Sequence, residues 1–160
     1  MTGPDGLPHS ETPLADAPAA TVTDAAPLSP RVASVLEIPL HRFLGVALID
    51  DSDPRGGIRC AVGDSALNNG GVLHGGIVTA LLDVACYLAL LPDLADDVNA
   101  VTHDLTASLM RPVSPGSSIY VHATVLRRGR SIAFLRAEAT VDDVLVATGQ
   151  VTKTLVTLRP

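Results

Sequence analysis

The chain contains very few aromatic side chains and no tryptophan. Phenylalanine and tyrosine each occur twice among 160 residues, so only 2% of the chain is aromatic. Hydrophobic residues nevertheless make up 47% of the sequence, and a core must therefore be built from valine, leucine, isoleucine and alanine. A length of 160 residues suits one domain and argues against a large enzyme, a repeat array or a coiled coil.

Cysteine is also scarce. Cys60 and Cys86 both lie in apolar stretches, which favours two buried thiols in a reducing cytosol over a disulfide. The spacing of cysteine and histidine suggests no metal site, and the N-terminus lacks the features of a signal peptide. The longest apolar stretch, 75–91, is interrupted by Asp83 and closed by Pro92. We therefore expect a cytoplasmic protein that binds no metal and enters no membrane.

Lysine and arginine are outnumbered by aspartate and glutamate. The chain has 11 lysines and arginines against 17 aspartates and glutamates, and its net charge of −6 argues against nucleic-acid binding. Residues 1–28 are rich in proline and alanine, contain no lysine or arginine and have no phenylalanine, tyrosine or tryptophan. Such a segment cannot bury enough apolar surface to offset the entropy lost on ordering. We predict a disordered tail at 1–28 and a folded domain at 29–160.

Hydrophobic periodicity predicts several strands and one long helix. Ser29-Pro30 signals the start of a short helix, which Pro39 is expected to end. The predicted strands are 44–50, 57–62, 101–110, 119–126, 132–141 and 144–158, and the long helix is 75–91. Because that helix is apolar on nearly every face, it must be surrounded by protein if it does not lie in a membrane. We expect an α+β fold in which an antiparallel sheet wraps around one long central helix.

A glycine-rich segment precedes the predicted helix and reads Asn68-Asn69-Gly70-Gly71-Val72-Leu73-His74-Gly75-Gly76. Glycines let a backbone approach a ligand closely, and the first amides of a helix have no intrahelical acceptors. The segment therefore offers a site for an anion or a polarised carbonyl oxygen. A plain glycine-rich turn is the alternative, and a Gly-Gly pair alone favours it.

Asp83 lies in the middle of the apolar helix. An ionised carboxylate there is costly unless it is paired, neutralised or at an interface. Thr79 and Tyr87 lie one turn before and one turn after it, so the three residues share a more polar stripe. The carboxylate either bonds to structural groups or faces solvent, or it is a tuned base or nucleophile.

Arginines cluster at 126–131 (LRRGRS), in a chain that is otherwise acidic. Several guanidinium groups on a hairpin turn suit a ligand that carries phosphate. A solvated turn is the alternative, and the run of charge alone favours it. His103 and His122 fall on predicted strands and are interpreted as structural.

Taken together, these segments resemble the hotdog-fold acyl-CoA thioesterases, in particular the phenylacetate-pathway and 4-hydroxybenzoyl-CoA thioesterase-like branch. The resemblance depends on the spacing of Asn68, Gly71 and the His74-Gly75-Gly76 triplet, with Asp83 nine residues after His74. It extends over about 35–158 and includes PLHRFLG at 39–45, Arg111-Pro112 and a basic-Gly-basic hairpin.

The resemblance implies hydrolysis of an acyl-CoA thioester, with coenzyme A as part of the substrate and no separate cofactor. The Gly75 amide would polarise the carbonyl, and Asp83 from the facing subunit would act as nucleophile or general base. His74 and Asn68 would fix the loop and orient the thioester or water, and Thr102 would position the water. The phosphates and pantetheine arm would bind to Arg127, Arg128, Gly129, Arg130 and Ser131.

The resemblance also implies homodimers or homotetramers whose active sites lie between subunits. A non-catalytic acyl-CoA-binding protein and a hotdog hydratase or dehydratase are the alternatives. The joint presence of the five residues Asn68, His74, Gly75, Asp83 and Thr102 favours the thioesterase. We expect Asp83→Asn to fold like wild type and to lose hydrolysis; the sequence leaves the acyl group open.

Overall fold

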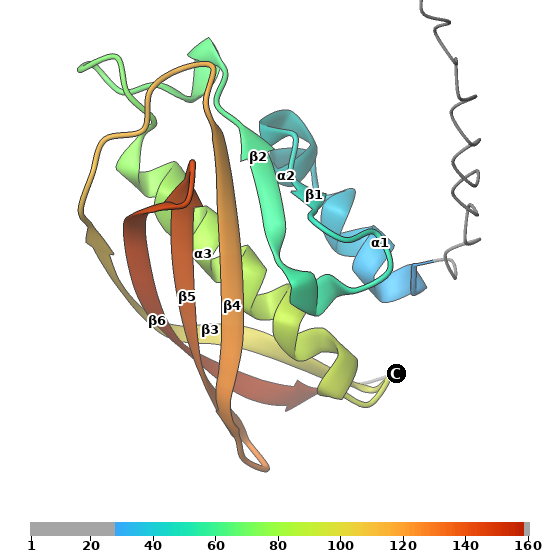
Figure 1. Cartoon of the computed structure of the whole chain (residues 1–160). Helices are drawn as coiled ribbons and strands as arrows, with labels where there is room; N and C mark the ends of the chain where they lie inside the picture. The colour runs from blue at the N-terminus through green and yellow to red at the C-terminus, as the bar shows by residue number, and fades with distance from the viewer. Residues whose placement is uncertain (1–27, 159–160) are drawn as a thin grey trace, which may run out of the picture.

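The computed structural model describes residues 28–158 (Figure 1). The helices are α1 (Pro30–Leu36), α2 (Pro39–Leu44) and α3 (Gly75–Leu90), with 3-10 turns η1 (Pro54–Gly56), η2 (Asp64–Ala66) and η3 (Leu91–Asp93). The strands are β1 (Ala47–Leu48), β2 (Ile58–Ala61), β3 (Val98–Leu109), β4 (Ser118–Arg128), β5 (Ile132–Val141) and β6 (Val144–Thr157). The predicted tail lies outside the described residues except for Leu28, which packs half-buried against the core.

One antiparallel sheet with the strand order β1-β2-β4-β5-β6-β3 curls around α3 (Figure 1). Nine of the 16 residues of α3 are buried, among them Leu81, Leu82 and Leu88, because the sheet and the two short helices cover most of its circumference. The stretch Gly75–Asp93 is long and apolar enough to span a membrane, yet over half of it is buried within the fold. The predicted α+β hotdog architecture is confirmed.

The N-terminal part of the domain differs from the prediction. Pro39 does not simply end the first helix; it begins α2, because its fixed φ suits the first position of a helix. Gly45 ends α2 in the left-handed conformation, with a φ of 67°. The strand predicted at 44–50 is therefore wrong for most of its length, and only Ala47–Leu48 pairs with β2.

The strand β3 forms an edge of the sheet. It is 12 residues long and pairs only with β6, so its other edge has no strand partner among residues 28–158. Its register with β6 shifts between Thr102 and Asp104, which places His103 in a β-bulge. The two cysteines, Cys60 and Cys86, are both buried and free, as the sequence predicts.

Candidate active site

The loop before α3 is shaped by Asn68. Its Oδ1 accepts hydrogen bonds from the backbone N–H groups of Gly70, at 2.8 Å, and Val72, at 3.4 Å. The Asn68 N–H in turn donates to the Val72 carbonyl at 2.8 Å. Gly71 adopts a φ of 74°, which a side chain would disfavour. Asn68 therefore folds the loop, while its predicted contact with substrate stays a prediction.

His74 caps α3, and Gly75 is the first helical residue. The His74 Nδ1 accepts a hydrogen bond from the Gly76 N–H at 2.9 Å, so a neutral His74 ring carries its proton on Nε2. Within the described part of the chain, no hydrogen bond uses the Gly75 N–H. This amide is therefore a free donor at the positive end of the helix dipole.

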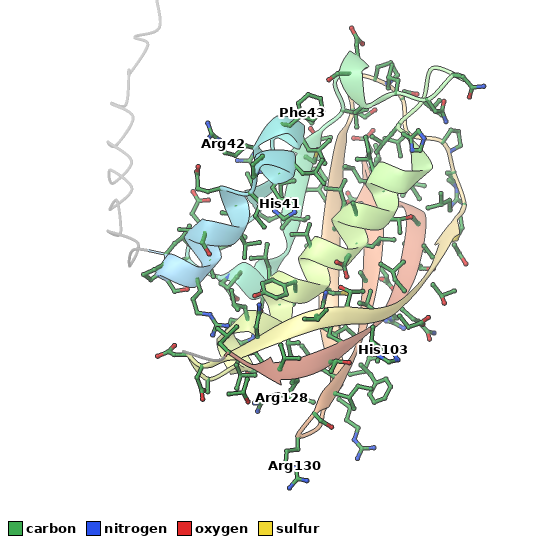
Figure 2. All side chains as sticks on the ribbon, turned by 180° about the vertical axis from the view of Figure 1, so that it is seen from behind. His41, Arg42, Phe43, His103, Arg128 and Arg130 are labelled. Atoms are coloured by element: carbon green, nitrogen blue, oxygen red, sulfur yellow. The ribbon has the colours of Figure 1, made fainter. Side chains whose placement is uncertain are left out.

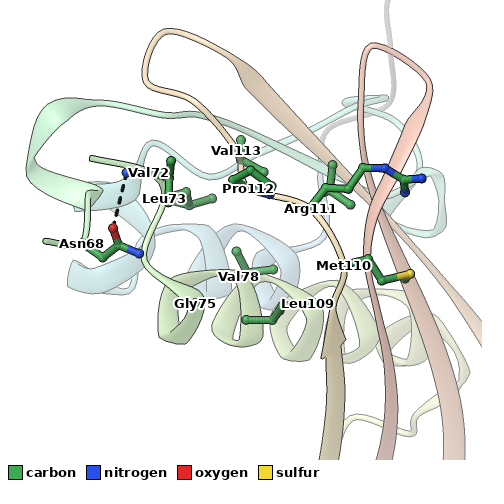
Figure 3. A pocket seen from close by; sticks show the side chains of 11 residues that line it. Asn68, Val72, Leu73, Gly75, Val78, Leu109, Met110, Arg111, Pro112 and Val113 are labelled. Carbon is green, nitrogen blue, oxygen red and sulfur yellow. Dashed lines mark hydrogen bonds between the residues drawn. The ribbon is translucent and has the colours of Figure 1, made fainter. Parts of the chain in front are cut away.

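The Gly75 amide lies at a pocket of about 310 Å³, which we call the amide pocket. Asn68, Leu109, Arg111 and Pro112 line it together with Gly75 (Figure 3). A Cβ on residue 75 would lie only 2.7 Å from Leu109 Cδ1, so any other residue at this position requires the Leu109 side chain to move. The pocket thus brings the glycine-rich loop and the Arg111-Pro112 segment together.

Asp83 is bound by two side chains from the sheet. Its Oδ1 accepts hydrogen bonds from Thr102 Oγ1 and from Lys153 Nζ, both at 2.8 Å. Lys153 Nζ also donates to Thr102 Oγ1 at 2.9 Å. Thr102, predicted to position water, therefore donates its hydroxyl proton to Asp83 in this chain. The sequence left open whether the Asp83 carboxylate is paired, neutralised or at an interface. In the structure it is paired with Lys153.

Lys153 is a residue that the sequence analysis did not single out. It is the only lysine of the chain, and its side chain is 1% exposed. The signal that could have found it is the alternation along β6. Val151, Lys153 and Leu155 are spaced by two residues, so the lysine takes an inward position between two apolar side chains.

The register of β3 and β6 aligns Thr102 with Lys153 next to the bulge at His103. Thr102 is paired with Lys153 in the register of β3 and β6, and the next pair is Asp104 with Thr152. Paired residues of an antiparallel sheet lie on the same face, so Thr102 and Lys153 both point toward α3.

A second pocket, of about 670 Å³, opens next to Asp83, and we call it the acid pocket. Its walls come from α1, α2, α3, β3 and β6 and are mostly apolar. His41 lines it, and its Nδ1 donates to the Val35 carbonyl at 2.6 Å, which leaves Nε2 available (Figure 2). Tyr87 also lines it, with its hydroxyl donating to Asn99 Oδ1 at 2.6 Å.

Cys86 directly precedes Tyr87 on α3 and is fully buried. Burial raises the pKa of the Cys86 thiol to about 12, an effect that the positive charge of Lys153 opposes only in part. The thiol is therefore protonated at neutral pH and is not a nucleophile. The carboxylate of Asp83 can attack a carbonyl carbon or accept a proton, and Nε2 of His41 is a second possible proton acceptor at the acid pocket.

The two pockets are separate within one chain. Gly75 and Asp83 are eight residues apart on α3, which corresponds to about 12 Å along the helix axis. One thioester carbonyl cannot contact both groups at that separation, because a hydrogen bond and an attacking atom each require about 3 Å.

The predicted coenzyme A residues form the tip of the β4–β5 hairpin. Arg127 and Arg128 end β4, and residues 129–131 form the turn. The three arginines 127, 128 and 130 are exposed, and no carboxylate of residues 28–158 lies within ion-pair distance of them (Figure 2). Figure 1 shows this tip at the end of the sheet opposite the start of α3. The hairpin is therefore remote from the amide pocket of the same chain.

The hairpin is connected to the acid pocket, and not to the amide pocket, by a row of paired residues in the sheet. Arg128 is paired with Ala133, Ala133 with Lys153, and Lys153 with Thr102. These four residues form one row across β4, β5, β6 and β3, about 14 Å from end to end.

Comparisons with known proteins point to one family. Residues 70–148 match the family model described as the thioesterase superfamily. Human acyl-coenzyme A thioesterase 13 is 31% identical over 119 residues, which cover 72% of this chain and 84% of the human protein.

Solved structures agree with this assignment. A phenylacetic acid degradation-related protein from Ralstonia eutropha JMP134 is 27% identical, with a TM-score of 0.63 and coverage of 79% of this chain and 91% of its own. The PaaI protein from the phenylacetic acid degradation operon of E. coli is 20% identical and shares the fold. Its TM-score is 0.71, with coverage of 81% of this chain and 94% of its own.

Proposed function

The chain belongs to the thioesterase superfamily, and from that premise we propose that it hydrolyses an acyl-CoA thioester to a free acid and coenzyme A. The observation that carries the proposal is the environment of Asp83. Its carboxylate is bound on one oxygen by Lys153 and Thr102, and its side chain lies at a pocket of about 670 Å³. A group of this kind can attack a carbonyl carbon or accept the proton of an attacking water.

The Gly75 amide supplies the complementary function. Negative charge develops on the carbonyl oxygen as the thioester is attacked, and an unused N–H at a helix N-terminus stabilises that charge. Donors in comparable oxyanion holes contribute about 3–4 kcal/mol to the transition state. In this proposal Asn68 and His74 act through the backbone, since they fix the loop and the first turn that aim the amide.

Two copies of the chain are needed to bring these functions together. The distance between Gly75 and Asp83 excludes their action on one carbonyl within a subunit, so Gly75 of the partner subunit would face Asp83. The free edge of β3 is the surface we propose for the contact. It exposes Val101 and Leu109, and a long unpaired strand is a template for pairing with another chain. Edge-to-edge pairing of β3 would give a homodimer, which a second contact could extend to a homotetramer.

The β4–β5 hairpin is our candidate for binding the nucleotide. Arg127, Arg128 and Arg130 provide exposed guanidinium groups, and these form charge-assisted hydrogen bonds with phosphate. Gly129 and Ser131 complete the turn. Arg128 lies in one row of paired residues with Thr102, which lines the acid pocket. This row supports a coenzyme A whose thioester lies beside Asp83 and whose phosphates contact the hairpin.

The proposal is tested by free-thiol release from a panel of aryl, medium-chain and branched acyl-CoAs. Wild type, Asp83→Asn and Asp51→Asn are compared; the last is the same chemical change at an exposed turn. We expect release by wild type and by Asp51→Asn, and a loss of roughly 10²–10⁴-fold in Asp83→Asn. If no acyl-CoA is hydrolysed but tight binding persists, the chain is a non-catalytic acyl-CoA-binding protein.

A further inference from the structure

Lys153 is a buried cation with few partners. Its ammonium group has three donors, and two of them bond to Asp83 Oδ1 and Thr102 Oγ1. The ring centroid of Tyr87 lies 5.5 Å from Nζ, within the range of a cation–π contact. Asp83 is thus the only carboxylate of the described residues that balances its charge.

Packing alone does not require this lysine. A buried ion pair is often no more stabilising than apolar residues of the same volume, since desolvation offsets much of the Coulomb attraction. The neighbours Val151 and Leu155 on the same face of β6 show that apolar side chains fit this layer. What Lys153 adds to the fold is therefore its pair of hydrogen bonds to Asp83 and Thr102.

The bonds to Asp83 are asymmetric. Thr102 and Lys153 both donate to Oδ1, and no hydrogen bond among residues 28–158 ends on Oδ2. The side chain of Asp83 is 34% exposed and lines the acid pocket. Two donors from two strands restrict rotation of the carboxylate, so that Oδ2 is the oxygen left for a substrate.

We infer that Lys153 is a positioning residue, which together with Thr102 holds Oδ1 of Asp83 so that Oδ2 acts on the thioester. The inference rests on the proposed function. As a general base, Oδ2 takes a proton from water, the water oxygen adds to the carbonyl carbon, and the carbon–sulfur bond breaks. The proton then passes to the departing coenzyme A thiolate. As a nucleophile, Oδ2 itself forms the bond to carbon and expels the thiolate, and water hydrolyses the resulting anhydride.

The variant that tests the inference is Lys153→Met, which keeps the length of the side chain and removes the charge. We expect kcat to fall at least tenfold with KM changed less than twofold, because Asp83 loses its fixed orientation and not its pocket. Lys153→Arg retains a cationic donor and should recover part of kcat. Ile58→Val, on β2 and separated from β6 by two strands, is the control for a small loss of core packing.

Rescue by the conservative variant separates positioning from a merely structural role. Lys153→Arg and Lys153→Met both disturb the packing at this position, so only a positioning role predicts that arginine recovers kcat while methionine does not. The other groups that face Asp83 are Thr102 on β3, Tyr87 and Cys86 on α3, and His41 on α2. His41→Gln is therefore measured in parallel, since His41 lines the same pocket and has Nε2 available.

The outcomes are distinguishable from failure of the proposed function. If Asp83→Asn is inactive while Lys153→Met keeps the kcat and the KM of wild type, the inference is overturned and the function stands. If no acyl-CoA is hydrolysed by wild type, the proposed function fails, and crystal structures of wild type and Lys153→Met decide. The same Asp83 rotamer in both would overturn positioning by Lys153. Should Lys153→Met not fold, Lys153→Gln takes its place in each comparison.

Discussion

The two pockets of the candidate site are built in different ways. The amide pocket depends on a loop in which Asn68 and His74 bond to backbone groups two to four residues away. The acid pocket depends on side chains from three elements, and Asp83 is 19 residues from Thr102 and 70 from Lys153. One functional group is thus set by local backbone geometry and the other by long-range pairing of strands.

This difference determines which structural changes would displace the functional group of each pocket. The amide stays in place as long as α3 begins at Gly75, because its direction follows from the helix itself. The carboxylate depends on the register of β3 with β6, where a slip by one residue would turn Lys153 to the outer face.

At the amide pocket, the largest effect is expected from removing the Gly75 N–H alone. Proline is tolerated at the first helical position, and His74 has the extended conformation that precedes proline readily, with ψ at 129°. Leu109→Ala makes room for the new ring, so Gly75→Pro/Leu109→Ala is compared with Gly75→Ala/Leu109→Ala. We expect a kcat roughly 10²–10³-fold lower in the proline variant. Equal kcat values would show that this amide does not stabilise the oxyanion.

Mixing two inactive variants tests whether the two pockets act across subunits. Asp83→Asn protein is unfolded and refolded together with Gly75→Pro/Leu109→Ala protein. If the chain forms the proposed dimer, each mixed dimer has one site with both defects and one intact site, so random pairing of equal amounts should restore about a quarter of the wild-type activity per site. Thiol release measures the recovery. No recovery, although mass spectrometry detects mixed dimers, would place both functions in one subunit.

A smaller effect is expected at the basic hairpin. In Arg128→Gln/Arg130→Gln we expect KM for acyl-CoA to rise roughly tenfold, as exposed charge-assisted contacts to phosphate are lost. KM for a short thioester of the same acid without the nucleotide should not change. Arg59→Gln, an exposed arginine on β2, is the control. An equal rise in KM for both thioesters would remove the proposed role of the hairpin.

The smallest effect is expected at Cys86, whose thiol we predict not to be alkylated in the folded protein. Its pKa of about 12 means that thiolate forms only as the pH approaches that value, so iodoacetamide should leave the folded protein unmodified at pH 8. Mass spectrometry of the labelled peptides checks this. Gly75→Ala/Leu109→Ala should be equally unreactive, whereas a variant that loosens the acid pocket should label faster. Rapid labelling of wild type would show that α3 is less well enclosed than the structure indicates.

The ion pair between Lys153 and Asp83 alters the stability predicted for Asp83→Asn. The sequence alone predicts that this variant folds like wild type, but the substitution leaves Lys153 buried without a carboxylate. Because Asp83 is partly exposed, and asparagine still offers an oxygen to Lys153, we expect a loss of about 1–3 kcal/mol in the free energy of unfolding. The chain should therefore still fold, with a lower Tm in thermal unfolding.

Much of the fold was predictable because its signals are local. The start of α1 at Ser29-Pro30, the long helix from Gly75 and the four long strands that follow each depend on caps, turns and periodicity over a few residues. The helix α2 was not predicted, since Pro39 can end one helix or begin another. Which of these it does depends on how the short segment packs against its neighbours.

The long apolar helix, the need for a sheet to cover it, and the spacing of Asn68, His74 and Gly75 at its start can all be read from the sequence. These features follow from residues close together in the chain, where propensity and hydrogen bonding act without a partner element. That Asp83 is paired with Lys153 and Thr102 follows from the folded chain alone. Those contacts require β3 and β6 to be in register beneath α3, and register is set by the packing of the whole sheet.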